Sequence, residues 1–435
     1  MTTESIKTEV GSYFISNYPP YSCWTVDAIA EARAAMQRLP HPDVPLGLYL
    51  HIPFCRKRCK FCYFKVFTGK NSVEIESYVQ ALCREIELVS RLPSMGDRPF
   101  RFVYFGGGTP SFLSSKQLAN LVDRLRQNVH WDMAEEVTFE CEPGTLSQSK
   151  IQTLRELGIT RLSLGVENFS DAVLEENGRA HLSREVYRAW EWIQDAEFPT
   201  VNIDLISGMV GETWENWQQN ISKTLELSPD SITIYQMELP FNTVYSADIL
   251  KDHSIAPVAD WPTKRAWVQT AFESFERAGY VQSSAYTMIK DSTKVGFSYR
   301  DNLWQGSDLL ATGIASFGHI GGVHYQNLAQ WGEYLGALDE NRLPLGRAYL
   351  PTVSQRLIRE LILLLKRGYL DLSYFENKFQ VNVWEQFQSI WTQLIERGLA
   401  KSAEGQIRLT MDGLLRVDSL LPLFFEAEFQ GVRYT

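Results

Sequence analysis

Three cysteines within eight residues, Cys55, Cys59 and Cys62, are the part of this sequence that points most directly to chemistry. Thiolates at such short spacing are the usual ligands of iron–sulfur clusters, which are normally held by four cysteines. Three cysteines leave one iron without a protein ligand, and an open metal position is typical of sites that bind a substrate or cofactor. Zinc is the alternative metal, but zinc sites usually need two ligand pairs, and no second pair follows. Three buried free thiols are a further alternative, disfavoured because free cysteines are usually buried singly.

Glycines and carboxylates follow other apolar segments of the chain. The run Gly106-Gly107-Gly108-Thr109 comes after an apolar stretch, and glycines allow a backbone to approach a ligand closely. Glu140 lies near the end of another apolar stretch, and Asp204 lies inside a third, where a charge is unfavourable unless it is paired. Each feature also has an ordinary interpretation, a turn or a solvated carboxylate, but Asp204 is a better candidate for a site residue than an average aspartate.

From residue 46 to about 245, short apolar segments alternate with amphipathic helical segments. The apolar segments are rich in β-branched and aromatic residues and nearly continuous, as parallel strands covered on both faces are. The expected strands are Leu46–Ile52, Phe100–Phe105, Glu136–Cys141, Arg161–Val166, Val201–Ile206 and Ser231–Met237. The expected helices include one from Ser72 to Arg91 and others that begin at Ser147, Ser170, Ser183 and Thr213. Six β–α steps predict a parallel sheet, either open or closed into a barrel.

The segments on either side of this core differ from it. Residues 1–45 are rich in proline and predict an irregular N-terminal arm with one helix, Thr25 to Arg38. Residues 246–345 predict an added α+β segment with a long helix, Pro262 to Ala278, and a glycine-rich run of turns to Gly322. Residues 346–435 predict a helical domain that resembles a winged helix. Its expected helices are Ser354–Arg367, Val383–Arg397 and Met411–Leu421.

Composition and charge exclude several classes of protein. The 435 residues are 44% hydrophobic and 22% charged, which is ordinary for a soluble protein of two or three domains. A net charge of −10 argues against nucleic acid and anionic membranes as partners, and no apolar run is long enough to span a membrane. The other cysteines, Cys23, Cys83 and Cys141, are scattered and show no disulfide framework, so we expect a cytoplasmic protein.

The spacing Cys-x3-Cys-x2-Cys resembles the signature of the radical S-adenosylmethionine (SAM) enzymes. The longer run that starts at Tyr49 and includes His51, Cys55 and Phe61 resembles their oxygen-independent coproporphyrinogen III oxidase-like branch. The resemblance extends from about Leu48 to Asn327. It implies that residues 46–245 form a curved, partial (β/α)6 barrel with the site at the C-terminal strand edges. It also implies that the segment 246–345 lies beside the substrate or a second cofactor, and that the C-terminal domain is a lid or substrate-side domain.

The same resemblance implies the cofactors and the residues that hold them. The cofactors are one [4Fe–4S] cluster, with Cys55, Cys59 and Cys62 as its ligands, and one or two SAM molecules. The implied SAM-binding residues are Tyr49, Phe61, Gly107, Gly108, Thr109, Glu140, Glu167, Arg179, Asp204 and, beside a second SAM, Phe317. Glu140 matches a glutamate that holds the ribose hydroxyls, and Arg179 matches an arginine that pairs with the carboxylate of SAM. No catalytic residue follows from the sequence.

Two positions depart from the pattern of the oxidases. Phe64 stands where they have a fourth cysteine, and Glu167 stands where the family usually has glutamine. The first departure argues against decarboxylation as the first choice and favours the oxidase-like relatives, which include methyltransferases that use two SAM molecules and a haem chaperone. We therefore expect a radical SAM enzyme that makes a 5′-deoxyadenosyl radical and transfers such a group to a large unsaturated or tetrapyrrole-like substrate. Oxidative decarboxylation of coproporphyrinogen III and haem binding by a chaperone are the alternatives. The expected partners are this small molecule and an electron donor such as flavodoxin or ferredoxin.

Overall fold

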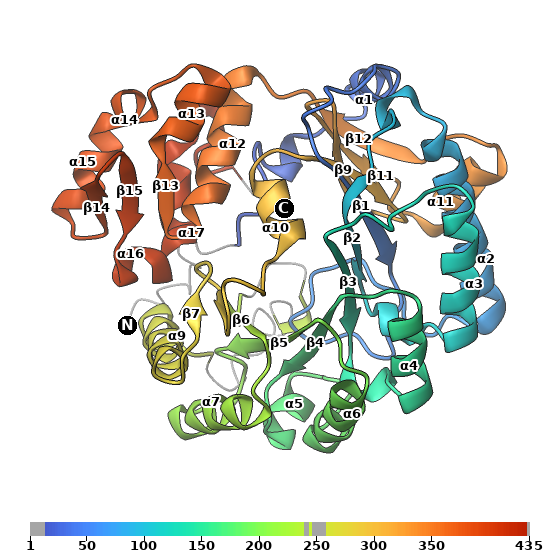
Figure 1. Cartoon of the computed structure of the whole chain (residues 1–435), viewed down its shortest axis with the longest axis horizontal. Helices are drawn as coiled ribbons and strands as arrows, with labels where there is room; N and C mark the ends of the chain where they lie inside the picture. Colours follow the sequence, from blue (N-terminus) through green and yellow to red (C-terminus); the bar gives the residue numbers. More distant parts are fainter. Residues whose placement is uncertain (1–13, 239–242, 246–257, 433–435) are drawn as a thin grey trace, which may run out of the picture.

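A computed structural model describes residues 14–238, 243–245 and 258–432. A curved sheet of twelve strands runs through the molecule in the order β12-β11-β10-β9-β1-β2-β3-β4-β5-β6-β8-β7 (Figure 1). Its central strands are β1 (Leu46–Ile52), β2 (Phe100–Gly107), β3 (Glu136–Cys141), β4 (Arg161–Glu167), β5 (Thr200–Ser207) and β6 (Ser231–Gln236). Each of these six strands pairs in parallel with the next, so all six C-terminal ends lie at one edge of the sheet.

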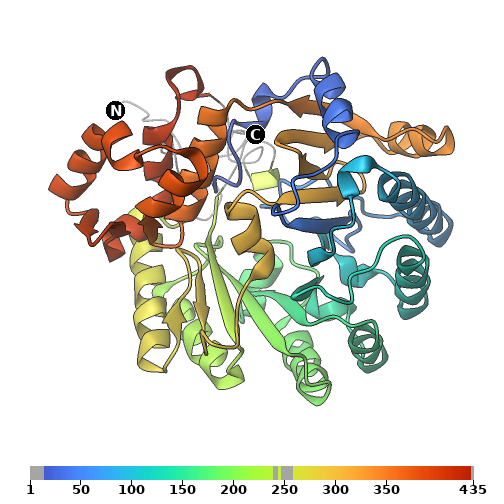
Figure 2. The same cartoon turned by 45° about the horizontal axis from the view of Figure 1, so that its top comes forward.

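Helices cover the outer face of the central strands, as the alternating sequence pattern predicts (Figure 2). They are α2 (Ser72–Ser90), α3 (Ser115–Arg126), α4 (Gln148–Glu156), α5 (Asp171–Glu176), α6 (Ser183–Asp195) and α7 (Trp214–Leu227). Strand β1 is buried along almost its whole length because it lies in the middle of the sheet with side chains packed on both faces. The predicted partial (β/α)6 barrel is therefore confirmed.

The helix caps agree with the sequence in part. Ser147 and Thr213 cap α4 and α7 as predicted. The cap of α2, however, is Asn71 rather than Ser72, and its side-chain oxygen accepts hydrogen bonds from the amides of Val73 and Glu74 at 3.0 Å. Ser183 is already the first residue of α6, and the amide before it, that of Leu182, donates to Glu185 at 2.8 Å. In both cases a side chain in the first turn, Asn71 or Glu185, accepts hydrogen bonds from backbone amides that have no partner inside the helix.

The segment 246–345, as far as it is described, extends the barrel sheet at both ends instead of forming a separate layer. Beyond α9 (Trp261–Arg277), β7 (Val281–Gln282) and β8 (Thr287–Ile289) continue the sheet next to β6. After α10 (Ser298–Trp304), β9 (Asp308–Thr312) pairs in parallel with β1 on the other side.

The prediction that a glycine-rich run of turns reaches Gly322 was wrong in part. Within this run, residues Phe317–Ile320 form strand β10, which pairs in an antiparallel hairpin with β11 (Val323–Asn327) directly after it. The turn itself is only Gly321-Gly322, with φ of 56° and 82°. Two consecutive residues with positive φ are what a two-residue hairpin turn requires. Helix α11 (Trp331–Asp339) and β12 (Leu345–Tyr349) complete this side of the sheet.

The C-terminal residues form a second body with its own hydrophobic core. Helix α12 (Val353–Leu365) packs there with a small sheet of order β13-β15-β14, and fully buried Phe375, Trp391 and Ile407 belong to this core. The other elements are β13 (Tyr369–Asp371), α13 (Leu372–Phe379), α14 (Val383–Gln386), α15 (Gln388–Glu396), β14 (Ala400–Ala403), β15 (Gln406–Leu409), α16 (Met411–Leu415) and α17 (Val417–Leu420). The two predicted helices 383–397 and 411–421 are each broken, at Phe387 and Arg416, whose backbone angles are not helical.

The N-terminal arm joins the two bodies. Its helix α1 (Ile29–Met36) is shorter than predicted, and Thr25 pairs with Ala348 of β12. Ile15 and Tyr18 are buried in the C-terminal core. Of the proposed domain boundaries, the one at residues 245 and 246 touches residues outside the described part, and the one at 346 falls within β12.

Candidate active site

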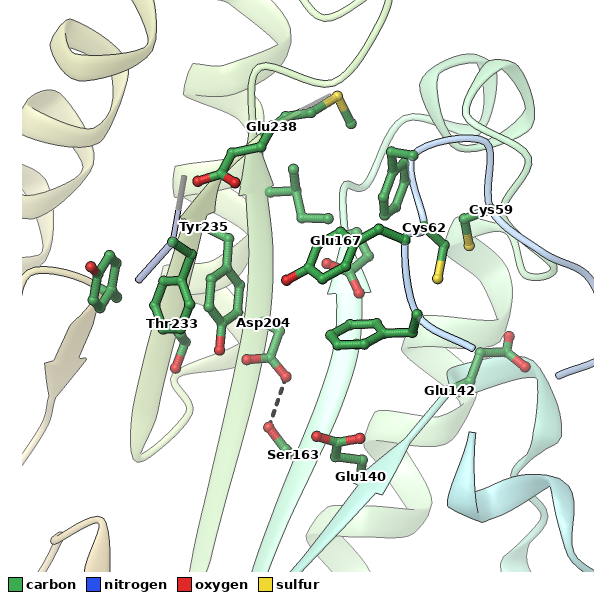
Figure 3. A pocket seen from close by; sticks show the side chains of 18 of the residues that line it. Cys59, Cys62, Glu140, Glu142, Ser163, Glu167, Asp204, Thr233, Tyr235 and Glu238 are labelled. Carbon is green, nitrogen blue, oxygen red and sulfur yellow. Dashed lines mark hydrogen bonds between the residues drawn. The ribbon is translucent and has the colours of Figure 1, made fainter. Parts of the chain in front are cut away.

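A cavity of about 440 Å³ lies at the C-terminal ends of the central strands, between the cysteine loop and the C-terminal domain (Figure 3). Most of the site residues inferred from the sequence line it: Cys55, Cys59, Phe61, Cys62, Gly107, Gly108, Thr109, Glu140, Glu167, Arg179 and Asp204. They come from the ends of β1 to β5 and from the loops that follow these strands. The parallel sheet gathers them because successive strands end at the same edge.

The loop from Cys55 to Cys62 follows β1 directly. The amide of Lys60 donates to the carbonyl of Asn177 at 3.1 Å, which holds the loop against the end of α5. Cys55 Sγ lies 3.4 Å from Thr109 Oγ1, and Arg179 Nη1 lies 3.3 Å from Cys59 Sγ. Burial raises the pKa of the Cys55 thiol to about 11, so this group needs a nearby positive charge, such as a metal, to become a thiolate.

Glu140, at the end of β3, is held by two donors. The hydroxyl of Tyr104 donates to Oε1 at 2.7 Å, and the amide of Gly107 donates to Oε2 at 3.1 Å. Burial raises the pKa of this carboxyl to about 7, although both hydrogen bonds lower it. The carboxyl of Glu140 is therefore anchored on the glycine turn of β2 and still lines the cavity.

Asp204, in the middle of β5, has the partners that a buried carboxylate requires. Ser163 Oγ donates to Oδ2 at 2.7 Å and Asn202 Nδ2 donates to Oδ1 at 2.9 Å. The first of these bonds joins β4 and β5 and is drawn in Figure 3. Burial raises the pKa of Asp204, and the two hydrogen bonds oppose this effect.

Arg179 connects the cysteine loop to the end of β4. Besides Cys59, it contacts the carbonyl of Gly165 at 3.0 Å and the carboxylate of Glu167 at 3.5 Å. Glu167 has a positive φ of 64°, which is uncommon for a residue with a side chain and turns its carboxylate into the cavity. Burial raises the pKa of Glu167 to about 7, and the charge of Arg179 opposes this effect. The three carboxylates Glu140, Glu167 and Asp204 surround one space in Figure 3.

Residues 49–223, which contain the cysteine loop and these carboxylates, match the family model described as the radical SAM superfamily. The chain therefore contains a radical SAM domain. The cofactors of this superfamily are a [4Fe–4S] cluster and SAM, as the sequence predicts.

Two kinds of protein are among its relatives. The haem chaperone HemW of Bacillus subtilis is 27% identical over 372 residues, 84% of this chain and 96% of HemW. The oxygen-independent coproporphyrinogen III oxidase of Salmonella typhimurium is 28% identical over 403 residues, 88% of this chain and 86% of the oxidase. The solved structure of the Escherichia coli oxidase HemN superposes with a TM-score of 0.81 at 25% identity, covering 95% of this chain and 97% of HemN. No helix in the described ranges is long and apolar enough to cross a membrane.

The surroundings of the cysteine loop leave room for a cluster beside Cys55. In the part of the chain that the structure describes, no three His, Cys, Asp or Glu side chains converge closely enough to hold one metal ion. Cysteine ligands of a cluster bind different irons and lie farther apart. Gly108 keeps the space beside Cys55 open, because a Cβ there would lie only 3.1 Å from Sγ.

Two of the predicted SAM contacts lie outside the cavity wall. Tyr49 points its hydroxyl at His51 Nδ1, 3.1 Å away, and stacks on Tyr104, which does line the cavity. Phe317 packs on Tyr21, with ring centroids 4.3 Å apart, and on Trp24. The predicted roles of Tyr49 and Phe317 therefore remain proposals, as do those of the residues in the cavity.

Glu142 is a site residue that the sequence did not single out. Its carboxylate accepts two hydrogen bonds from Arg56, at 3.1 and 3.2 Å, and lies 3.1 Å from His181 Nδ1. Burial would raise its pKa, but the hydrogen bond with His181 and the charge of Arg56 lower the pKa to about 2. Glu142 thus ties the cysteine loop to the end of β3. One feature of the sequence could have pointed to Glu142. Arg56 is permanently charged and lies between two of the predicted cluster cysteines, and such a cation usually has a carboxylate partner.

The far end of the cavity is aromatic and was also missed. Tyr235 of β6 and Tyr286 stack with ring centroids 6.4 Å apart, and both line the cavity. The hydroxyl of Tyr286 donates to Asp418, which also pairs with the fully buried Lys366 at 2.8 Å. Arg265 of α9 and Arg416 of the C-terminal domain line the same end. These residues come from distant segments, so no local pattern groups them.

Proposed function

We propose that this chain is a radical SAM enzyme that acts on a large, flat, unsaturated substrate of the tetrapyrrole class. A [4Fe–4S] cluster held by Cys55, Cys59 and Cys62 would supply the electron for the reductive cleavage of SAM. The observation that carries the proposal is the cavity itself, which places the three cysteines and an aromatic, arginine-bearing end in one enclosure. A volume of about 440 Å³ lies within the range of small-molecule sites.

The walls of the cavity support a division into two halves. Next to the cysteines, Glu140 and Asp204 are acceptors suited to the hydroxyls of a ribose, and Arg179 is a donor suited to a carboxylate. At the far end, the stacked rings of Tyr235 and Tyr286 offer a face for a flat π-system. Arg265 and Arg416 suit the carboxylates of such a substrate. The two arginines come from the barrel side and from the C-terminal domain, so a substrate that meets both would bridge these bodies.

We propose methyl or methylene transfer as the reaction, because Phe64 occupies the position of the fourth cysteine of the oxidases. Phe64 is 51% exposed and packs against Tyr63, with ring centroids 4.6 Å apart, and a phenyl ring offers iron no ligand. Decarboxylation of coproporphyrinogen III and haem chaperoning, the activities named for the relatives, are the alternatives that the experiment must separate.

The first experiment compares the products of SAM under anaerobic conditions. The full chain is reconstituted with iron and sulfide, reduced with dithionite and given SAM with either haem or coproporphyrinogen III. 5′-Deoxyadenosine, S-adenosylhomocysteine and the tetrapyrrole products are followed by mass spectrometry. We expect 5′-deoxyadenosine to increase when a tetrapyrrole is added, with one S-adenosylhomocysteine for each carbon transferred.

The alternatives give different results in this experiment. 5′-Deoxyadenosine with loss of carbon dioxide from the substrate, and no S-adenosylhomocysteine, would replace methyl transfer by decarboxylation. Tight haem binding without 5′-deoxyadenosine from a fully clustered protein would contradict the enzyme and favour the chaperone.

We further propose that a protein electron donor docks on the cysteine loop. The stretch from Arg56 to Lys65 carries five basic residues in a chain of net charge −10. Lys57 and Lys65 are exposed, and neither has an ion-pair partner within the described residues. Tyr63 and Phe64 add an exposed aromatic contact. A basic patch over the cluster favours an acidic donor, such as a flavodoxin or ferredoxin, through electrostatic steering.

Charge reversal on this patch is expected to slow reduction by a protein donor. Lys65→Glu should lower the second-order rate of cluster reduction by flavodoxin about fivefold at low salt, and less at high salt, because screening removes the attraction. The rate is measured by stopped-flow absorbance. Lys401→Glu, an exposed lysine of the C-terminal domain, is the control. Equal rates for the two variants would exclude this docking surface, whereas dithionite, which needs none, should reduce both alike.

A further inference from the structure

A second cavity, of about 500 Å³, shares no lining residue with the first. Three parts of the chain form it: the arm from Ala35 to Val44, the sheet edge at β9, β10 and the Gly321-Gly322 turn, and helices α12 and α13 of the C-terminal domain. Its position is therefore a junction between the two bodies of the protein. None of the sequence motifs discussed above accounts for it.

The acidic side chains of this cavity are already paired. Asp308 forms an ion pair with Arg98 at 2.9 Å, and both side chains are at most 8% exposed. Glu360 forms an ion pair with Lys378 at 2.8 Å and also accepts from the hydroxyl of Tyr374. Each pair is neutral as a unit. The net charge of the cavity therefore depends on its other ionisable side chains.

Those other side chains include three arginines, Arg38, Arg356 and Arg359. Arg356 has no ion-pair partner among the residues that the structure describes, and its Nε is buried without a hydrogen-bond partner. Its guanidinium lies against Gly322, where a Cβ would come within 2.8 Å of Nη1. The glycine turn thus leaves room for this guanidinium at the cavity wall. Arg38, on the arm, also lines the cavity and is exposed.

The surroundings of His319 show the same excess of positive charge. His319 is buried in the cavity wall and shares a hydrogen bond between Nδ1 atoms with His324 at 2.8 Å. Burial, His324 and the charges of Arg359, Arg356 and Lys378 hold the pKa of His319 well below its usual range. The guanidinium groups of Arg356 and Arg359 thus add positive charge beside His319, whereas the charge of Lys378 is paired with that of Glu360.

We propose that this second cavity binds the phosphate group of a small anion, with Arg356 and Arg38 as its main ligands. A guanidinium presents paired donors that match phosphate oxygens, and a charge-assisted bond is strongest where the cation lacks another partner. The cavity is larger than inorganic phosphate needs, so it has room for an organic phosphate. The bound anion would join the arm to the C-terminal domain, and we expect it to stabilise the folded protein as any ligand of the native state does.

Calorimetric titration of the reconstituted full chain tests this site. Inorganic phosphate and ribose 5-phosphate are the probes, and chloride at matched ionic strength is the blank. We expect Arg356→Gln to weaken binding of both probes about tenfold, and Arg38→Gln to weaken it about threefold. Arg397→Gln removes the same charge from an exposed position in the same domain and should leave binding unchanged. Tighter binding of ribose 5-phosphate than of phosphate would identify an organic phosphate as the occupant, and equal binding would identify free phosphate.

Other results would overturn the proposal. These are equal affinities in wild type, Arg356→Gln and Arg38→Gln, or the same rise in thermal midpoint with chloride as with phosphate. Arg38 is exposed on the arm, so its variant should fold even if the Arg356 variant does not.

Discussion

Replacing Cys59 with alanine is expected to abolish 5′-deoxyadenosine formation and to leave the protein without an intact cluster. Cys59 lies in the middle of the cysteine loop, and its sulfur is the one that contacts Arg179. With only two cysteines left, the irons would lack the third thiolate that holds the cluster in place. We expect activity to fall by at least about a thousandfold, since no other group can supply the electron to SAM. Iron and sulfide analysis, electron paramagnetic resonance and product analysis measure the three consequences.

The matched control for this prediction is Cys23→Ala. Cys23 lies in the N-terminal arm, away from the cavity lining, and it is a free thiol like Cys59. This variant should keep its full iron content and activity. A Cys59→Ala protein with a full complement of iron and undiminished 5′-deoxyadenosine would refute the assignment of the cluster ligands.

Replacing Arg179 with methionine is expected to destabilise the chain and to weaken SAM binding. The change removes the only charge that the structure places against Glu167 as an ion pair among the described residues, which leaves a buried carboxylate unpaired. Breaking a buried pair in this way costs about 3 kcal/mol. Since Arg179 lowers the pKa of Glu167, its loss raises that pKa further above about 7. Urea unfolding and calorimetric titration with SAM measure the two effects.

The pH dependence of this variant follows from the sign of the shift. A carboxyl whose folded pKa is raised binds its proton more tightly in the folded protein, so stability falls as pH rises through the folded pKa. Arg179→Met should therefore lose more stability at pH 8 than at pH 6, at which Glu167 is protonated and carries no charge. Unfolding curves that are equally displaced at both values would contradict this account.

A double variant separates the structural effect from the binding effect. Adding Glu167→Gln to Arg179→Met removes the unpaired charge, so we expect most of the stability to return without the pH dependence, while SAM binding stays weak. Arg98→Met is the control. It breaks a different buried ion pair, that of Arg98 with Asp308, and neither residue lines the cavity that contains the cysteines. It should destabilise the chain to a similar degree and bind SAM normally.

The sequence alone was sufficient to predict the core of the fold and most of one wall of the site. Apolar segments alternating with amphipathic helices predict parallel strands, and parallel strands end at a common edge. Residues that follow successive strands, such as Cys55, Gly108, Glu140 and Arg179, must then meet there. This prediction needs no knowledge of long-range contacts, because each of these residues belongs to a motif that is recognised from its neighbours in the chain.

Helix ends and the segment 246–345 were predicted less well. Asn71 caps α2 although Ser72 has the same chemistry, because the choice between neighbouring caps depends on backbone angles. Strands β8 and β9 join the barrel sheet by pairing with β6 and β1, which lie far away in the chain. Short strands that pair over such distances leave little periodic signal in the sequence.

The tertiary structure alone decided which side chains complete the site. Glu142 meets Arg56 and His181 only because the cysteine loop folds back over the end of β3. Tyr286 and Asp418 are brought together by the docking of the C-terminal domain on the barrel. Contacts of this kind depend on how whole elements pack, a property of the folded surfaces that residue types and local spacing do not encode, whereas the cysteine loop and the strand-end motifs depend only on neighbours in the chain.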